Sequence, residues 1–134
     1  MKKLPPPGEE LLELAIADLE KCEDDSRYVI NMYDWHSPIL RGENAGRCSV
    51  CLAGAVMAKS CRGGPHEPLS PALFDDETAA SLSWLNHVRG HSGVDYEKNK
   101  KAAIEAWRAY VKKTHQKRAG EPLLGRANGL LEPE

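Results

Sequence analysis

The chain has 134 residues, of which 28% are charged and 41% hydrophobic, and its net charge is −2. These values are typical of one folded domain and exclude an intrinsically disordered chain. No apolar run approaches the roughly 20 residues of a membrane-spanning helix, and the first lysines precede prolines rather than the apolar core of a secretory signal. We therefore expect a single domain over residues 1–134 that is cytoplasmic and binds no membrane.

Four segments have apolar residues recurring every three or four positions, which is the spacing of a helix packed on a core. Glutamates open the first segment and aspartates open the third, as is typical of the amino ends of helices. The four helices are expected over residues 9–24, 48–60, 75–90 and 95–118. The sequence therefore predicts a mainly α fold, in the form of a compact single-domain bundle of about four helices.

The residue types change between the first two predicted helices. Residues 28–33 are rich in β-branched and aromatic side chains, which predicts a short strand or hairpin, with a helical continuation as the alternative. Residues 34–38 end in a proline and predict a turn. The ends of the chain, residues 1–8 and 119–134, are punctuated by proline and glycine and are expected to be flexible.

The second predicted helix carries a stripe of small residues, and we expect it at the centre of the fold. Cys48, Cys51, Ala55 and Ala58 share this stripe, and Gly54 lies beside it. A glycine inside a helix costs up to about 1 kcal/mol of helix propensity. A close neighbour that requires Gly54 is therefore expected.

Charge is divided between the first and last predicted helices. The simplest interpretation is that the two helices attract each other or keep their outer faces solvated. The alternative is that each presents a charged face to a partner. The acidic residues are Glu9, Glu10, Glu13, Asp18, Glu20, Glu23, Asp24 and Asp25, and the basic residues are Lys98, Lys100, Lys101, Arg108, Lys112, Lys113, Lys117 and Arg118.

Three of the four cysteines lie close together in the sequence and raise the question of a zinc site. Cys48, Cys51, Cys61 and His66 have the ligand types of structural zinc. A continuous helix, however, would separate Cys51 from Cys61 by about 15 Å, whereas zinc ligands place their sulfurs about 2.3 Å from the metal. We therefore predict buried structural cysteines and no metal or cofactor. A zinc-stabilised nucleic-acid-binding or adaptor module is the alternative.

A cysteine-dependent enzyme is the second alternative, because Cys48 or Cys51 at a helix amino end would have an activated thiol. His87 and His91 also form an i, i+4 pair that can bind a metal, but no glutamate follows the first histidine as in zinc proteases. Histidines near the end of a helix are independently favourable for its dipole. The histidines available as a base are His36, His66, His87 and His91. No ordered nucleophile, base and orienting carboxylate can be identified, so no catalytic residue is predicted.

Tyr33, Trp35 and His36 form the best candidate for a protein-interaction surface. Tyrosine and tryptophan in loops are frequent anchors of interfaces. The alternative is that Trp35 closes the core from the end of a loop. Lysines around Trp107 and Tyr110 could instead contact nucleic acid, but the sequence pI of about 6.2 disfavours this.

Residues 28–32, 35–38 and 48–58 together resemble a group of small proteins encoded in tailed-phage genomes. The last segment begins with the shared motif Cys-x-Val-Cys-Leu-Ala-Gly. The group has no assigned activity or catalytic residue. The resemblance implies a viral protein made in a bacterial cytoplasm, where small phage proteins often bind a host or phage protein, including components of host defence.

We therefore predict a non-enzymatic protein-binding module with a host or phage protein as its partner. Nucleic acid is the less favoured partner. Exposure of Trp84 or Trp107 would indicate a homodimer, because an apolar stripe that includes a tryptophan needs to be covered.

Overall fold

The computed structural model describes residues 3–61 and 68–120, with side chains described as far as residue 114. Four α-helices and a three-stranded sheet make the described chain mainly helical, and a compact bundle stays a prediction. The elements are α1 (Glu9–Glu23), β1 (Tyr28–Ile30), β2 (His36–Pro38), β3 (Cys48–Val50), α2 (Leu52–Val56), the π-helical turn η1 (Met57–Cys61), the 3-10 turn η2 (Pro71–Leu73), α3 (Asp76–Arg89) and α4 (Lys100–Gly120).

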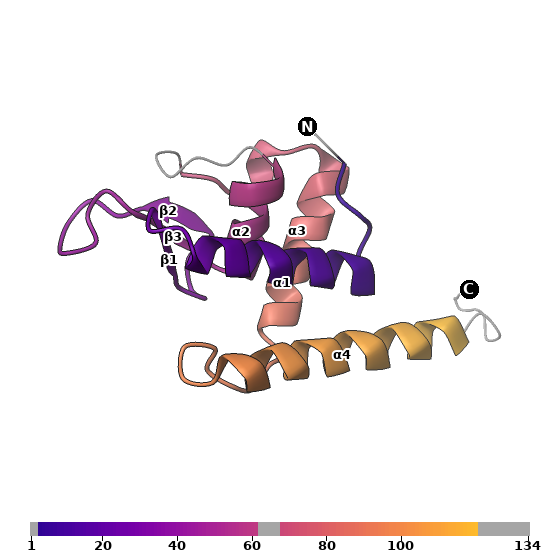
Figure 1. The fold of residues 1–134 in the computed structure, drawn as a ribbon. Coiled ribbons are helices and arrows are strands. Elements are labelled where there is room, and N and C mark those ends of the chain that lie inside the picture. The colour runs from indigo at the N-terminus through magenta and orange to yellow at the C-terminus, as the bar shows by residue number, and fades with distance from the viewer. Residues whose placement is uncertain (1–2, 62–67, 121–134) are drawn as a thin grey trace.

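Helix α1 lies between the other helices (Figure 1). It contacts α2, α3 and α4, while the sheet lies at one end of the molecule and the loop between β2 and β3 projects away from it. The predicted apolar stripe of α1 is buried: Leu11, Leu12, Ala15, Ile16, Leu19 and Cys22. None of the helices in the described ranges is long and apolar enough to cross a membrane.

Helices α1 and α3 begin and end within a residue or two of the predicted limits. The Asp75 carboxylate accepts from the Thr78 amide (3.3 Å) and caps α3. Helix α4 begins five residues later than predicted, because residues 95–99 form a turn. The Asn99 side chain accepts from the Ala102 amide (3.0 Å) at the new start of α4.

The sheet shows where the sequence prediction was wrong. Residues 48–50, predicted as helix, form the central strand β3, which pairs in parallel with β1 and antiparallel with β2. Residues 36–38, predicted as part of a turn, form β2. The strand predicted at 28–33 is present as β1, but its partner is β3 and not an adjacent hairpin strand. Pairing on both edges of β3 satisfies its buried backbone, which overrides the local helical pattern.

The predicted helix over 48–60 is divided into three parts. After β3, Cys51 caps α2 by accepting from the Gly54 amide (3.4 Å), and the chain continues as α2 and then as η1. All five residues of α2 are buried, so the expectation that this segment lies at the centre of the fold is confirmed. Gly54 lies directly against the Trp35 carbonyl. A Cβ at this position would overlap that oxygen, which is the expected packing reason for glycine.

The acidic helix α1 and the basic helix α4 face each other, as the simplest interpretation of the charge division expected. Arg108 on α4 donates two bonds to Glu13 on α1, at 2.7 and 2.8 Å. Lys100 lies 2.7 Å from Glu23 and 3.8 Å from Glu20. These pairs are exposed, so each stabilises the fold by about 0.5 kcal/mol.

The amino-terminal segment, expected to be flexible, packs against the body over residues 3–8. Leu4 is buried, and the Ser81 hydroxyl donates to the Pro5 carbonyl (3.1 Å). Helix α4 continues to Gly120, and residues 121–134 lie outside the described residues. Trp107 is buried and Trp84 is partly buried against the core, so neither forms the exposed stripe that would indicate a homodimer.

Candidate functional site

The three residues predicted as an interaction surface lie in different environments. Tyr33, in the turn between β1 and β2, is 89% exposed. Trp35 is partly buried against the core, as the alternative interpretation proposed. His36 is completely buried in β2, with its Nδ1 3.4 Å from the Cys48 sulfur. Of the three, Tyr33 presents its whole side chain to a partner.

Hydrogen bonds fix the turn that carries Tyr33. The Asn31 side chain accepts from the Tyr33 amide (2.9 Å) and donates to the Asp34 carboxylate (3.1 Å). That carboxylate also accepts from the Ser49 hydroxyl on β3 (2.9 Å). Residue types that favour turns at 31 and 34 are visible in the sequence, but the bond to Ser49 depends on the sheet and could not be inferred. The turn is therefore tied to the central strand.

Tyr33 forms one wall of a groove of about 380 Å³, which we call the Tyr33 groove. Met32 also lines it, and the rest of the lining comes mainly from the end of α3 and the residues that follow, namely residues 89, 90 and 92–97. Trp107 lines the groove from α4 and stacks on Tyr96, with ring centres 5.7 Å apart. No sequence pattern indicates this groove, because its lining comes from three separate parts of the chain.

The inner wall of the Tyr33 groove is held by hydrogen bonds. The Trp107 indole donates to the Arg89 carbonyl (3.3 Å), and the Tyr96 hydroxyl donates to the Glu23 carboxylate on α1 (2.9 Å). Burial is the main cause of a raised pKa of Tyr96, and the bond to Glu23 adds to it. Tyr96 is therefore a neutral donor at physiological pH, and hydrogen bonds hold both aromatic residues that line this part of the groove.

The cysteines are thiols in apolar surroundings. Burial raises the pKa of Cys48 and Cys61 to about 11 and that of Cys22 to about 12, and it also raises the pKa of Cys51. Cys22, Cys48 and Cys51 are buried, and Cys61 is half-buried. A thiol with a raised pKa is a weak nucleophile at neutral pH. This environment is typical of structural cysteines.

The four residues of the predicted zinc alternative do not come together among the described residues. Cys51 caps the start of α2, whereas Cys61 ends η1 on the far side of that helical segment. His66 lies outside the described residues. Among the side chains that the structure describes, in residues 3–61 and 68–114, no three or more of His, Cys, Asp or Glu are grouped so that they could hold a metal ion.

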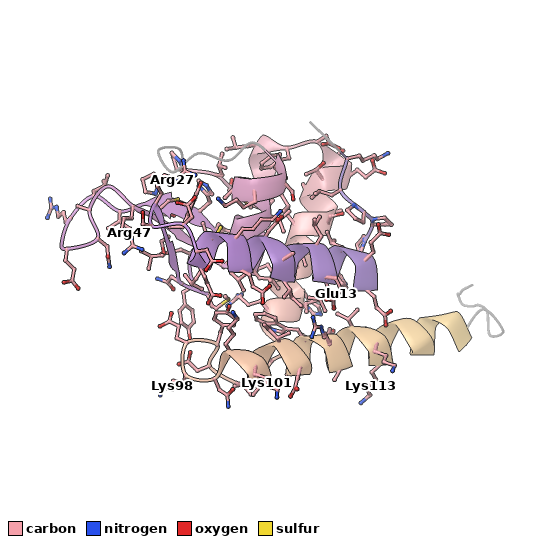
Figure 2. All side chains as sticks on the ribbon, in the orientation of Figure 1. Glu13, Arg27, Arg47, Lys98, Lys101 and Lys113 are labelled. Carbon is pink, nitrogen blue, oxygen red and sulfur yellow. The ribbon has the colours of Figure 1, made fainter. Side chains whose placement is uncertain are left out.

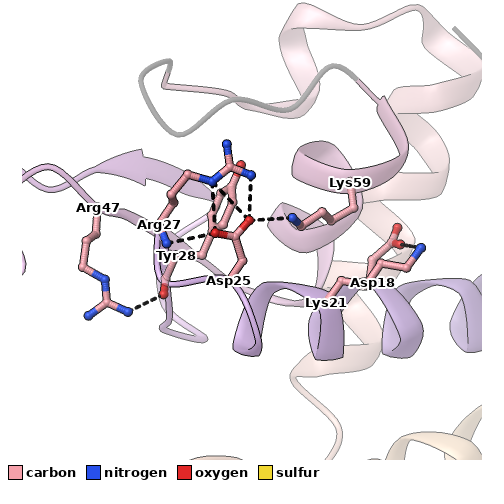
Figure 3. Close-up of polar contacts among 7 residues, drawn as sticks. All are labelled: Asp18, Lys21, Asp25, Arg27, Tyr28, Arg47 and Lys59. Carbon is pink, nitrogen blue, oxygen red and sulfur yellow. Dashed lines mark hydrogen bonds and ion pairs between the residues drawn. The ribbon is translucent and has the colours of Figure 1, made fainter.

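Two of the acidic residues, Asp18 on α1 and Asp25 just after it, bind side chains of η1, and both are drawn in Figure 3. Asp25 binds Arg27 (2.7 Å) and Lys59 (2.8 Å), and its pKa is held well below the usual range, chiefly by the bonds from these two cations. Both cations also lie over the Tyr28 ring, at 5.7 and 5.0 Å from its centre. This cluster therefore connects η1 to the first residue of β1.

Asp18 is completely buried in α1, and its Oδ2 accepts from the Ser60 hydroxyl at 2.5 Å. Its Oδ1 has no hydrogen-bond partner among the described residues, although the Lys21 ammonium lies 3.7 Å away. Burial therefore raises the pKa of this carboxyl. A charged group with incomplete pairing destabilises the folded state at neutral pH.

The basic face predicted for nucleic-acid contact does not present the two aromatic rings, those of Trp107 and Tyr110, that the prediction included. Lys98, Lys101 and Lys113 are exposed along α4 and the turn before it (Figure 2). Trp107, however, points into the core, and Tyr110 is partly buried. Stacking on bases requires exposed rings.

A scan of the chain against protein-family models finds no match, and no curated protein or solved structure matches it.

Proposed function

We propose that this chain is a compact, non-enzymatic protein-binding module that contacts its partner through Tyr33 and the Tyr33 groove. One observation carries the proposal: a large aromatic side chain, 89% exposed, stands on a hydrogen-bonded turn beside a groove of about 380 Å³. Exposed tyrosines with an adjacent pocket are typical anchors of protein interfaces.

The turn also reduces the cost of binding. Ordering a mobile loop on association costs conformational entropy, and a turn that is already hydrogen-bonded avoids part of that loss. The groove offers an apolar floor at Trp107 together with polar groups at its rim, including Arg89 and Asp95. This combination suits a protein segment that inserts an apolar side chain and pairs its polar groups at the edge.

The resemblance to small tailed-phage proteins supports a host or phage protein in a bacterial cytoplasm as the partner. A component of host defence is the first partner that we would test, so that the module would act as a phage accessory or counter-defence protein.

A photo-cross-linking amino acid placed at position 33 tests the proposal in bacterial cells. Leu40 is the matched control, because it is 84% exposed but lies in the loop between β2 and β3. We expect a discrete covalent adduct from position 33 and none of the same mass from position 40. With the partner identified, Tyr33→Ala should weaken the purified complex by 2 kcal/mol or more, about 30-fold, and Leu40→Ala should leave it unchanged. Equal affinity of Tyr33→Ala and wild type would contradict the proposal.

A cysteine-dependent enzyme is the second candidate, favoured by the 3.4 Å contact between the Cys48 sulfur and the His36 imidazole. Both residues are buried and the pKa of Cys48 is raised, so this candidate requires an opening of the sheet that exposes the thiol. Alkylation of Cys48 faster than that of a free thiol at neutral pH would support it, and slow labelling would remove it.

A further inference from the structure

Three rings meet where α3 ends and α4 passes beside it. His87 lies in the last turn of α3, His91 follows that helix by two residues, and Tyr110 comes from α4. The two imidazole centres are 4.6 Å apart, and the His91 ring stacks on Tyr110 at 4.1 Å with an interplanar angle of 8°. The His87 Nε2 lies 3.0 Å from the Tyr110 hydroxyl. Both histidines are exposed, and none of the three residues lines the Tyr33 groove.

We propose that His87 and His91 form a surface site for a divalent transition-metal ion such as Ni²⁺, Cu²⁺ or Zn²⁺, and that Tyr110 positions the two imidazoles. Imidazole nitrogen is a preferred ligand of all three ions. The site is distinct from the zinc set of cysteines and His66 weighed in the sequence, and it does not depend on the proposed protein-binding function.

The spacing of the two rings fits a shared ion. A metal–nitrogen bond of about 2.1 Å places the metal about 3.2 Å from the centre of each imidazole. Two imidazoles bound at right angles then have centres about 4.5 Å apart, and two bound at the tetrahedral angle have centres about 5.2 Å apart. The observed distance of 4.6 Å lies between these two values, so the two rings are close enough to share one ion.

Tyr110 orients the two histidine ligands and is not itself a ligand of the metal. When its hydroxyl accepts from the Nε2–H of His87, the Nδ1 lone pair of that ring is left for the ion. Stacking on Tyr110 holds the plane of His91. A hydrogen bond to the second ring nitrogen is the usual support of a metal-bound histidine.

Two protein ligands leave the remaining coordination positions to water, so we expect moderate and reversible binding rather than that of a closed structural site. Arg89 lies between the two histidines in sequence, and a nearby cation weakens the attraction for a metal ion. The site would therefore respond to metal concentration without being required for folding.

Calorimetric titration of the full chain with NiCl₂ in a non-coordinating buffer tests the site, because Ni²⁺ does not oxidise the thiols. We expect one ion per chain, with affinity reduced about tenfold or more in His87→Ala and in His91→Ala. His66→Ala is the matched control and should bind as wild type does. Tyr110→Phe should bind about tenfold more weakly while its melting temperature in chelator stays that of wild type.

A measurement on the wild-type chain covers the case in which a variant does not fold. Bound Ni²⁺ is paramagnetic and should broaden the NMR resonances of residues 86–92 and 110 before all others. Broadening centred elsewhere, unchanged affinity in both histidine variants, or no binding at millimolar Ni²⁺ would each overturn the proposal.

Discussion

The Trp35 carbonyl oxygen occupies the space that a side chain at Gly54 would need. The chain therefore crosses α2 at backbone distance at Trp35, just before it enters β2. A residue with any side chain would push β2 away from α2.

Replacing Gly54 by alanine should consequently destabilise the protein by about 3 kcal/mol, even though alanine favours helix, because overpacking against backbone is not relieved by a rotamer change. Urea unfolding measures the loss. Gly90→Ala is the control, since the added Cβ there makes only an ordinary contact with the His87 carbonyl at 3.4 Å, and its stability should change by about 1 kcal/mol or less. A Gly54→Ala protein as stable as wild type would show that β2 is not held against α2.

Asp18→Asn should make the protein more stable at pH 7, because burial and incomplete pairing disfavour the charged form of the carboxyl in the folded state. Its pKa is raised in the folded state, so the folded chain holds the proton more tightly than the unfolded chain does. Wild type should therefore lose stability relative to Asp18→Asn as the pH rises above about 3.9, the ordinary pKa of aspartate, and through the raised value. Paired urea titrations across this range measure the difference.

Asp25→Asn should have the opposite effect. Arg27 and Lys59 hold the pKa of Asp25 low, so its contribution to stability is present at pH 7 and is lost as the pH falls below the ordinary value of about 3.9 toward the lowered one. The variant should be less stable than wild type at neutral pH and should approach it in acid. If both aspartate variants shifted stability in the same direction at pH 7, the electrostatic assignment of one carboxylate would be wrong.

Cysteine labelling should follow burial. Iodoacetamide at neutral pH should modify Cys61 first, since it alone of the four cysteines is half-buried rather than buried, and even Cys61 should react more slowly than a free thiol because its pKa is raised to about 11. Cys22, Cys48 and Cys51 should be labelled only when the protein unfolds. Peptide mass spectrometry over time gives the order, and early modification of Cys48 would contradict the buried placement.

The pair Glu13–Arg108 should couple α1 to α4 weakly. A double-mutant cycle with Glu13→Gln and Arg108→Gln should give an interaction energy of about 0.5 kcal/mol, because both side chains are half exposed. The coupling should shrink in about 1 M salt, where charges are screened within about 3 Å. Lys113→Gln, also on α4, is the control and should leave stability unchanged at both salt concentrations.

What could be predicted from the sequence depended on whether the interactions were local. The limits of α1 and α3 were foreseen because apolar spacing and the Asp75 cap lie within each helix. Residues 48–50 were misassigned because the partners of β3 lie 10 to 20 residues away, and a small-residue stripe that continues into α2 looked locally helical.

The candidate site was foreseen in part for the same reason. Tyr33 could be selected as an aromatic residue in a turn, and it is exposed. His36 was grouped with it, but β2 turns that side chain inward against Cys48. Most of the other lining of the Tyr33 groove comes from residues 89, 90 and 92–97, and nothing in the sequence near position 33 indicates them.

The strand order has a consequence for how the chain folds. β1 and β2 do not pair with each other, and each pairs as a strand with β3, the last of the three to be synthesised. A nascent chain that ends before residue 48 lacks the central strand. The two outer strands therefore cannot pair into this sheet until β3 has been synthesised. The register of Tyr28 with Cys48 closes a loop of twenty residues, and this closure places sheet formation late, after the local helix α1 has had time to form.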